Sequence, residues 1–535
     1  MKKILFILAL ILAGTTACKK SDFADAYADP SKISQTTVEK QFTGFLTSYS
    51  YSNSDKGQRG YVVPSYWNYF VVLRTTLLHY TQAVGFENAD NQYVPGIAAT
   101  NDRWNDYYNF LAQYRELQNV NAKLSAEDQA DRRIYMIAAT IFFYDQTQKV
   151  VDLHGDIPWS EAGRLSANGG DYASSLPKYD AAASIYTKML DDLKAFSDEL
   201  NTLAVKPGIA AGFKNQDLIN RGDIMLWKRY CNSLRLRMLT RVSDVPSFQG
   251  RANSEIGQIL GNPATYPVVT SNAENIMIRV HDVTSDITAR GFQSGLEDWN
   301  GNIAGKVMID HMVSNNDPRL RAMYEPGANA GGVYNGLDPM LNRTAQNALI
   351  AGGTLAIYNR STISRNQFFP GILITAAEIS FIAAEYYLKA ANAGAAKAAY
   401  ENGIRQSIEY YYWLRTLSNN NVSGTLTPTN TAEINAYIAS PGVNWDLAMT
   451  TADKLKRIAL QKWIHFSVIQ PNESWAELRR LDAPVLSFEV DAANAQKQPP
   501  LRWLYASNER TYNAANYQAV AAQDLLTTRI FWDVR

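Results

Sequence analysis

Apolar residues recur every three or four positions along much of the chain, which is the spacing of one face of an α-helix. The first such stretch covers 65–83, and the second covers 102–124, where Asn101 is placed to cap the helix. Comparable patterns predict further helices over 128–150, 180–200, 223–242, 375–392, 395–414 and 451–469. A turn at Gly394 would join two of these in a helix–turn–helix of tetratricopeptide size. The predicted helices therefore form two blocks.

Other segments lack this periodicity. Residues 244–372 are rich in Gly, Asn, Pro and Ser. Because a structureless loop of that length is unusual in a compact protein, we expect short helices and hairpins that carry functional loops. Residues 18–60 are polar and are expected to form a tether followed by irregular structure. Shorter loops are predicted at 85–100 and at 152–162, where Gly and Pro oppose a helix.

The first 17 residues have the layout of a secretory signal peptide, with two lysines, an apolar run over 4–12 and small residues behind it. That run is too short to cross a hydrocarbon core about 30 Å thick. Cleavage could release a protein with a free Cys18, or Cys18 could be acylated as the N-terminus of a lipoprotein. Thr15 stands where a bacterial lipobox usually has Leu. We favour acylation, because it removes Cys18 from the thiol pool and leaves Cys231 as a lone buried thiol.

Composition narrows the function classes. Basic side chains number 51 and acidic side chains number 51, so the chain lacks the basic excess of a nucleic-acid-binding protein. No later run of 18 apolar residues follows the signal peptide, and nothing else is expected to span a membrane. The 31 Tyr and 11 Trp residues are abundant, and their apolar rings with a polar handle suit sugar or peptide recognition as well as protein cores.

Several segments resemble one protein family, in the order in which that family carries them. They are "DLHGDIPWSEA" (152–162), "LPKYDAAASIYTKMLDDL" (176–193), "GDIMLWKRYCNSLRLRML" (222–239), "LITAAEISFIAAEYYLKA" (373–390), "YENGIRQSIEYYY" (400–412), "LQKWIHFSVIQPNESWAELRR" (460–480) and "RWLYASNERTYN" (502–513). By these segments the chain is similar to the SusD/RagB-type nutrient-binding lipoproteins. The resemblance extends from the signal peptide to about residue 520.

This resemblance implies an all-α fold in which four tetratricopeptide-like helix pairs form a scaffold and an irregular region carries the ligand site. It also implies a partner, a SusC-type TonB-dependent outer-membrane transporter, over which the lipoprotein sits as a hinged lid. The segment "CKKSDF" is similar to the polar stretch behind the acylated cysteine of surface-exposed relatives. We therefore expect an outer-membrane protein that is lipid-anchored and exposed on the cell surface.

The expected organisation is a signal peptide over 1–17, a lipid-anchored tether and irregular segment over 18–60, and a single SusD-like domain over 61–535. Within that domain we expect helical blocks at 61–243 and 373–480, the irregular ligand region at 244–372 and an irregular C-terminal segment at 481–535.

No catalytic or cofactor-binding motif stands out. The five histidines lack metal-ligand spacing, and the chain has no nucleophile elbow and no Walker loop. His154 beside Asp152 and Asp156 could be a metal site, but we favour a loop whose Asp carboxylates accept backbone N–H bonds. Glu378 and Glu385 could form an acid/base pair, yet ion pairs between packed helices are the favoured interpretation. An interhelix ion network is also predicted for Glu477, Arg479, Arg480 and Asp482. We predict a protein that is not an enzyme and that needs no cofactor and no metal.

The aromatic residues divide by their surroundings. Four lie on amphipathic helices and are expected in the core: Trp227, Trp413, Trp463 and Trp475. Five at helix starts or in polar loops are candidate ligand contacts: Trp67, Tyr93, Trp299, Tyr334 and Tyr358. Trp299 is the most suggestive, because carboxylates and amides flank it, and we add Asp298 and Asn300 to the predicted site. An aromatic plate beside such groups suits a sugar ring, and it equally suits a peptide.

Two other function classes stay open. A surface glycoside hydrolase on an all-α barrel would need two carboxylates about 5–10 Å apart in an aromatic cleft, and no stretch presents such a pair. A tetratricopeptide adaptor would have short turns, which the long irregular block at 244–372 does not match. The favoured function is a binding lipoprotein that captures an oligosaccharide or peptide and passes it to the transporter.

Overall fold

The computed structural model describes residues 36–535, and within them the chain is an all-α protein, as predicted. The predicted signal peptide and Cys18 lie outside the described residues. The helices of the first half are α3 (Val38–Ser50), α4 (Leu77–Tyr80), α5 (Ile97–Ala122), α6 (Ala126–Asp131), α7 (Arg133–His154), α8 (Ala182–Glu199), α9 (Pro207–Gln216), α10 (Ile224–Arg241) and α11 (Pro246–Gly261). Those of the second half are α12 (Gly291–Glu297), α13 (Lys306–Ser314), α14 (Leu320–Met323), α15 (Arg343–Gly352), α16 (Ala376–Lys389), α17 (Ala393–Leu417), α18 (Thr431–Ile438), α19 (Thr451–Phe466), α20 (Pro471–Leu481), α21 (Glu509–Tyr512) and α22 (Ala514–Tyr517).

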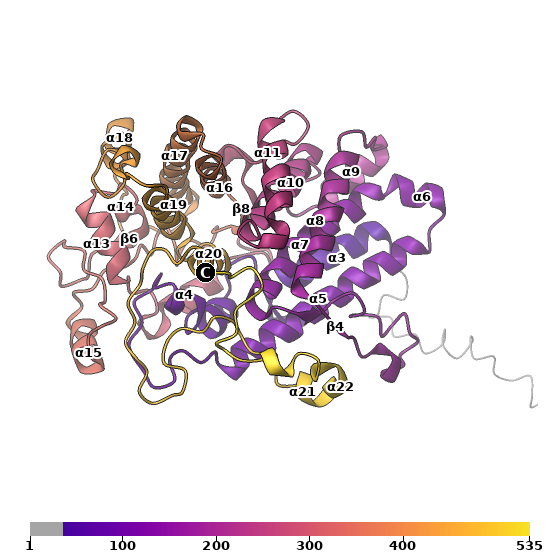
Figure 1. Cartoon of the computed structure of the whole chain (residues 1–535), viewed down its shortest axis with the longest axis horizontal. Helices are drawn as coiled ribbons and strands as arrows, with labels where there is room; N and C mark the ends of the chain where they lie inside the picture. The colour runs from indigo at the N-terminus through magenta and orange to yellow at the C-terminus, as the bar shows by residue number, and fades with distance from the viewer. Residues whose placement is uncertain (1–35) are drawn as a thin grey trace, which may run out of the picture.

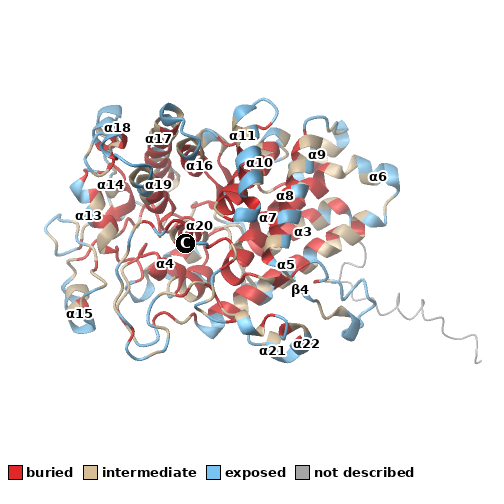
Figure 2. Ribbon diagram, in the orientation of Figure 1, coloured by how far each residue is buried: buried red, intermediate tan, exposed pale blue. Residues whose placement is uncertain are grey.

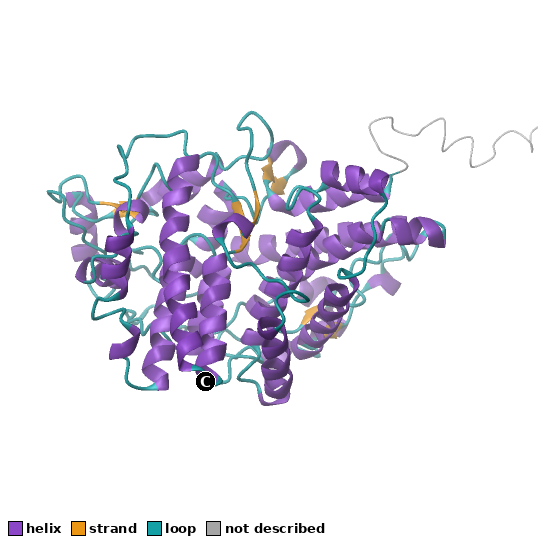
Figure 3. Ribbon diagram, turned by 90° about the horizontal axis from the view of Figure 1, so that it is seen from above, coloured by secondary structure: helices purple, strands orange, loops and turns teal. Residues whose placement is uncertain are grey.

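The strands are short and occur in antiparallel pairs that lie scattered between the helices (Figure 3). They are β1 (Ser52–Asn53) with β2 (Gln58–Arg59), β3 (Ile157–Pro158) with β4 (Tyr179–Asp180), β5 (Ile276–Ile278) with β8 (Gly371–Ile374), and β6 (Tyr324–Glu325) with β7 (Ile357–Tyr358). Within the described residues, every helix is either too short or too polar to cross a lipid bilayer.

Consecutive helices pack as pairs, namely α7 with α8, α10 with α11, α16 with α17, and α19 with α20 (Figure 1). The pairs also contact one another, because α10 packs on α16 and α16 packs on α19. The turn between α16 and α17 is at Ala391, whose φ is 57°, and Gly394 lies inside α17 instead of forming the predicted turn. The buried residues lie between these helices, while their outer faces are exposed (Figure 2).

The prediction of irregular structure over 18–60 is wrong where α3 forms. Phe42, Phe45, Leu46 and Tyr49 lie on one face of this helix and are buried, with the ring of Phe45 stacked on Phe110 at a centroid distance of 4.6 Å. The segment is polar on average, but three- and four-residue spacing gives it one apolar face that α5 and α7 cover.

The helix predicted over 65–83 is broken into two pieces. A π-helix, η2 (Trp67–Leu73), ends before Thr76, and α4 follows it. The backbone of Thr76 departs from helical geometry, with φ −128° and ψ −103°. The second predicted helix, α5, starts at Ile97, earlier than expected, and Gly96 is its N-cap. Asn101, the predicted cap, lies inside the helix, and its side-chain amide donates to the Ser507 hydroxyl.

A buried ion network joins the helix pairs, which confirms the structural role predicted for Glu378 and Glu385. Arg237 of α10 pairs with Glu378 of α16 at 2.5 Å. Arg480 of α20 binds Glu385 at 2.6 Å and Glu477 at 2.7 Å. Burial alone would raise the pKa of Glu385. The nearby cations Arg480, Lys389 and Lys462 outweigh burial and hold this pKa well below its usual value.

Arg479 and Asp482, which we placed in this network, lie outside it. The guanidinium of Arg479 lies 3.5 Å from the Trp475 ring centroid and donates to the carbonyl oxygens of Leu501 and Asp152. Neighbouring positions on a helix point about 100° apart, so Arg479 and Arg480 face different partners. Asp482 ends α20 in the left-handed region, with φ 49°, and is exposed.

The irregular block contains short helices, as expected, but it begins with the 16-residue α11, and its strands pair across long stretches of sequence and not in hairpins. The C-terminal segment 481–535 runs back across the molecule toward α7 and α5 (Figure 1). Its backbone N–H at Trp503 donates to Leu153 at 2.7 Å, and the Trp532 indole donates to Asp152 at 2.8 Å. This return brings the segment after α20 beside the loop that follows α4, where Gln82 donates to the Ser487 carbonyl at 2.6 Å.

Candidate functional site

The side chain of Trp299 projects into solvent because of its backbone conformation. It lies in η5 (Asp298–Asn300), has φ 57° and ψ 36°, and is 79% exposed. The left-handed region is unfavourable for a bulky residue, so neighbouring contacts must maintain it. One of these is Arg74, whose Nη2 donates to the Trp299 carbonyl at 3.0 Å. A large aromatic ring is thereby presented to solvent on a strained turn.

A row of further side chains leads up to Trp299 along η2. Tyr66 and Phe70 stack with their ring centroids 5.1 Å apart and an interplanar angle of 13°. The Arg74 guanidinium lies 5.1 Å from the Phe70 ring centroid, as in a cation–π contact. Tyr66, Phe70 and Arg74 were not among the predicted site residues, although their spacing of four places them on one helix face. We call Tyr66, Phe70, Arg74 and Trp299 the aromatic row.

Glycines bring the elements of this row together. A Cβ at Gly291 would lie 2.7 Å from the backbone nitrogen of Tyr66, so α12 can approach η2 only because Gly291 has no side chain. A Cβ at Gly301 would lie 2.7 Å from the Leu296 carbonyl oxygen and 3.1 Å from the Arg74 side chain. The close packing of α12 on η2 therefore fixes where Trp299 stands.

Beside Trp299 lies a hollow of about 150 Å³, which we call the Trp299 hollow. Its lining includes Arg74, Phe86, Glu87, Asn300, Arg343 and Ile350. Glu87 and Arg343 form an ion pair at 2.8 Å across it, and the Arg343 side chain is 64% exposed. A second hollow of about 430 Å³ shares Ala89 and Arg343 with the first and contains the carboxylates of Asp90, Glu489 and Asp491. The two hollows together offer an aromatic plate beside hydrogen-bond donors and acceptors.

The loop over 84–93 is fixed against the irregular block. Asn88 donates through Nδ2 to the carbonyl oxygens of Pro339 at 2.8 Å and Leu341 at 3.0 Å. Its backbone N–H donates to Oε1 of Gln346 at 2.8 Å. These bonds hold Glu87 and Ala89 in position beside Trp299.

Of the predicted site residues, the structure brings Trp299, Asp298 and Asn300 together on one exposed turn. Glu297 is directed into the protein, where it pairs with Arg365 at 2.7 Å and accepts from Ser364. Asn302 is buried, and its carbonyl oxygen accepts from the backbone N–H of Tyr358.

Tyr93 and Tyr358, two of the candidate ligand contacts, have buried rings. Tyr93 is 1% exposed, and its hydroxyl donates to the Glu489 carbonyl at 2.6 Å. Tyr358 is fully buried, and its hydroxyl donates to the Ala83 carbonyl at 2.6 Å. Each hydroxyl finds a partner inside the protein, so the loops can bury these rings without losing a hydrogen bond. Neither ring offers a face to a ligand in this structure.

Trp67 and Tyr334 are half-buried and do not line the Trp299 hollow. The guanidinium of Arg59 covers Trp67 at 4.9 Å from its ring centroid. Tyr334 packs against the core, and burial together with Glu325 raises the pKa of its hydroxyl. These two residues stay separate predictions of ligand contact.

The helical tryptophans mostly lie in the core. Trp227, Trp463 and Trp475 are buried, as predicted. Trp413 is only half-buried, and Arg279 covers its ring at 5.6 Å from the centroid.

His154 is part of the core and not of a polar site. Its ring packs edge-on against Trp104, and burial together with the charge of Arg502 holds its pKa well below the usual value. Asp156 accepts a hydrogen bond from the backbone N–H of Ala182 at 2.8 Å, which is the loop-stabilising role expected of it. Among residues 36–535, no three His, Cys, Asp or Glu side chains gather as they would around a metal ion.

Comparison with known proteins gives the family. A sequence profile of the SusD-like family, described as "Starch-binding associating with outer membrane", matches residues 34–506. No curated protein matches the chain.

Solved structures agree. A Bacteroidetes AC2a SusD-like protein is 21% identical, with a TM-score of 0.72 over 94% of this chain and 100% of its own. A chitin-binding protein is 21% identical, with a TM-score of 0.69 over 93% of this chain and 99% of its own. A SusD homologue from Bacteroides vulgatus is 22% identical, with a TM-score of 0.67 over 96% of this chain and 99% of its own. At these identities the likeness concerns the fold.

Proposed function

The chain belongs to the SusD-like family of starch-binding proteins associated with the outer membrane, and from this premise we propose that it captures an oligosaccharide or peptide nutrient at the Trp299 hollow. The observation that carries this proposal is Trp299 itself, 79% exposed on a strained turn beside a polar hollow. Exposed aromatic rings on strained backbone are costly for a fold, and a binding role accounts for the cost.

A carbohydrate ligand has the stronger support. A pyranose offers C–H faces that can stack on the Trp299 indole, and its hydroxyls can bond to Asn300, Glu87 and Arg343. The family description refers to starch, and one structural neighbour is a chitin-binding protein. A peptide would use the same groups through its backbone amides, so both ligand classes belong in the test.

The proposal includes an anchor and a partner. We expect Cys18 to be acylated, so that the protein is held at the outer membrane on the cell surface. We expect it to cover a SusC-type TonB-dependent transporter as a hinged lid and to release the captured nutrient into it. Replacing Cys18 with Ala should give a protein that no longer fractionates with outer membranes when the transporter is absent, and persistent membrane association would contradict the anchor.

The site is tested by calorimetric titration of the mature protein with maltoheptaose, chitohexaose and a tryptic digest of casein. For the probe that binds, Trp299→Ala should weaken affinity several-fold to tenfold, because an aromatic stacking contact contributes about 1 kcal/mol. Tyr512→Ala removes another exposed ring, 65% exposed on α21, and serves as the matched control. Equal affinity of the Trp299→Ala variant and the parent would place the site elsewhere.

The same titrations test the absence of catalysis. We expect each probe to be recovered unchanged after prolonged incubation. New reducing ends or new amino termini, lost on substitution of a single Asp or Glu, would show that the protein is a hydrolase.

A further inference from the structure

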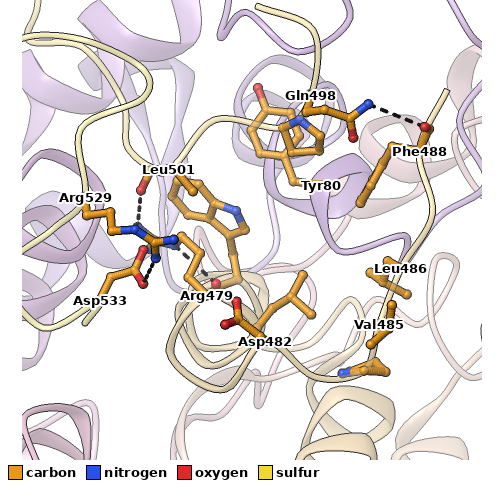
Figure 4. A pocket seen from close by; sticks show the side chains of 14 residues that line it. Tyr80, Arg479, Asp482, Val485, Leu486, Phe488, Gln498, Leu501, Arg529 and Asp533 are labelled. Carbon is orange, nitrogen blue, oxygen red and sulfur yellow. Dashed lines mark hydrogen bonds and ion pairs between the residues drawn. The ribbon is translucent and has the colours of Figure 1, made fainter. Parts of the chain in front are cut away.

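A third hollow, of about 410 Å³, lies between α20, the segment that follows it and the chain end (Figure 4). We call it the amphipathic hollow. It shares no lining residue with the Trp299 hollow or with the second hollow beside it. Its volume falls within the range of about 300–1,000 Å³ that is typical of small-molecule sites.

One end of the amphipathic hollow is apolar. Val485, Leu486 and Phe488 line it, and Val485 is 80% exposed (Figure 4). Tyr80 and Trp475 also contribute to the lining, but both are buried and present little ring face. Among the described residues, the Gln498 amide, which donates to the Phe488 carbonyl at 3.5 Å, is the one polar side chain beside these walls, so most sugar hydroxyls placed there would lose water without gaining partners. An apolar side chain would gain from burial. The walls therefore favour an apolar ligand group.

The other end of the hollow is charged. Arg479, Arg529 and Asp533 lie together on the side opposite Val485 and Leu486 (Figure 4). Arg529 pairs with Oδ1 of Asp533 at 2.5 Å, and the Arg529 side chain is 47% exposed. The Asp533 side chain is 1% exposed, and its Oδ2 has no hydrogen-bond partner. A buried carboxylate oxygen without a hydrogen-bond donor is unusual, and a donor from a ligand would satisfy it.

Asp482 adds a second carboxylate at the rim, in the exposed left-handed turn that ends α20. Burial raises the pKa of Asp533, and Asp482 adds to the rise against the lowering by Arg479 and Arg529. A positive group placed between the two carboxylates would relieve this repulsion. With two guanidinium and two carboxylate groups, the hollow is balanced in charge, which matches a ligand that carries both signs.

We propose that the amphipathic hollow binds apolar zwitterions, namely free apolar amino acids and short apolar peptides. The ligand ammonium group donates to Asp533 and Asp482, its carboxylate accepts from Arg529, and its side chain packs against Val485, Leu486 and Phe488. This proposal does not rest on the nutrient site at Trp299, because the two hollows have no residue in common.

Titration of the mature protein with L-leucine and leucyl-leucine tests it, with N-acetyl-leucinamide as the uncharged analogue. We expect both zwitterions to bind and the analogue to bind at least tenfold more weakly. The zwitterion with the higher affinity shows whether a single amino acid or a dipeptide fills the hollow. Undetectable binding of both, or equal binding of the uncharged analogue, would overturn the proposal.

Substitutions then locate the site. Asp482→Asn should weaken zwitterion binding several-fold without loss of folding, because Asn tolerates the left-handed backbone at this exposed position. Asp533→Asn should weaken it about tenfold, with circular dichroism to confirm folding, since Asp533 is buried. Glu127→Gln, which changes a carboxylate that is 85% exposed on α6, is the control. Trp299→Ala should leave zwitterion binding unchanged. Parent-like affinity in both Asp variants, or loss of zwitterion binding in Trp299→Ala, would show that the ligand binds elsewhere.

Discussion

Where the scaffold helices α7, α8, α10, α16, α17, α19 and α20 pack on one another, charged side chains are buried and paired. Along the edge built from loops 84–93, 298–301 and 482–499, polar groups are exposed or incompletely paired. Arg480, fully buried in the scaffold, binds two carboxylates, whereas Arg343 at the edge is 64% exposed and binds one. The scaffold uses its charges to fix helix against helix, whereas the edge leaves its charges accessible to a ligand.

The largest expected effect is on the scaffold. Trp227 of α10 is fully buried, and its indole donates to Asp217 at 2.7 Å. Trp227→Ala would leave a cavity and remove this bond, so we expect the free energy of unfolding to fall by about 3–5 kcal/mol in chemical denaturation. Trp299→Ala is the matched control at the edge and should change stability by less than about 0.5 kcal/mol. Equal losses in the two variants would remove the distinction between scaffold and edge.

The ion network should give the next largest effect. In the buried network, Arg480 and Lys462 each pair with both Glu385 and Glu477. Glu385→Gln removes one of these two negative charges. A buried cation that loses its partner is costly, so we expect a loss of about 3 kcal/mol. Glu127→Gln, on the exposed surface of α6, should have no measurable effect under the same conditions. A stable Glu385→Gln variant would mean that the network contributes specificity and not stability.

The sequence predicts an element of the fold well when residues close together in the chain determine that element. The α10 helix was predictable because Asp223 caps it and its apolar face repeats along the whole element. The α3 helix was missed because a single short apolar face is hidden in a polar segment, and packing against α5, α7 and α9 stabilises it. The break between η2 and α4 depends on the backbone at Thr76, for which no sequence signal such as Gly or Pro exists.

The site shows the same limit. The grouping of Trp299 with Asp298 and Asn300 is local, so the sequence could predict it. The hollow beside it depends on Glu87 and Arg343, which are far apart in the chain and meet only in the fold. The burial of Tyr93 likewise requires the carbonyl oxygen of Glu489 from the C-terminal segment. Long-range partners of this kind leave no periodic pattern in a single sequence.

Stability should also depend on pH through buried histidines, of which His79 of α4 packs against the edge loop 84–93. It is 4% exposed and stacks on Phe86 at a centroid distance of 4.1 Å. Burial lowers its pKa to about 3, against the raising effect of a backbone hydrogen bond with Gln92. The unfolded chain takes up a proton near pH 6.5, whereas the folded chain does so only near pH 3, so stability falls as pH falls through this window.

His79→Phe removes this group and keeps a stacking ring. The free energy of unfolding should fall between pH 7 and pH 5 in both proteins, and we expect the fall to be about 2 kcal/mol smaller in the variant than in the parent. Chemical denaturation at both pH values measures this difference. His281→Gln, at an exposed position, should change this difference much less. An unchanged pH dependence in His79→Phe would show that the pKa of His79 is the same in the folded and the unfolded protein.

The smallest expected effect sharpens the comparison most, because it separates binding from stability at one residue. Trp299 has φ 57°, and Asn adopts that region more readily than Trp. Trp299→Asn should therefore raise the free energy of unfolding by about 0.5–1 kcal/mol, since the ring is 79% exposed and contributes little burial. The same variant should bind the nutrient probe as weakly as Trp299→Ala. Met449→Asn replaces a residue that is 84% exposed and does not have positive φ, so it should give no gain. A gain in stability together with a loss of binding at position 299 alone would show that the edge keeps strain for its ligand, and a loss of stability there would show that the Trp299 ring supports the fold.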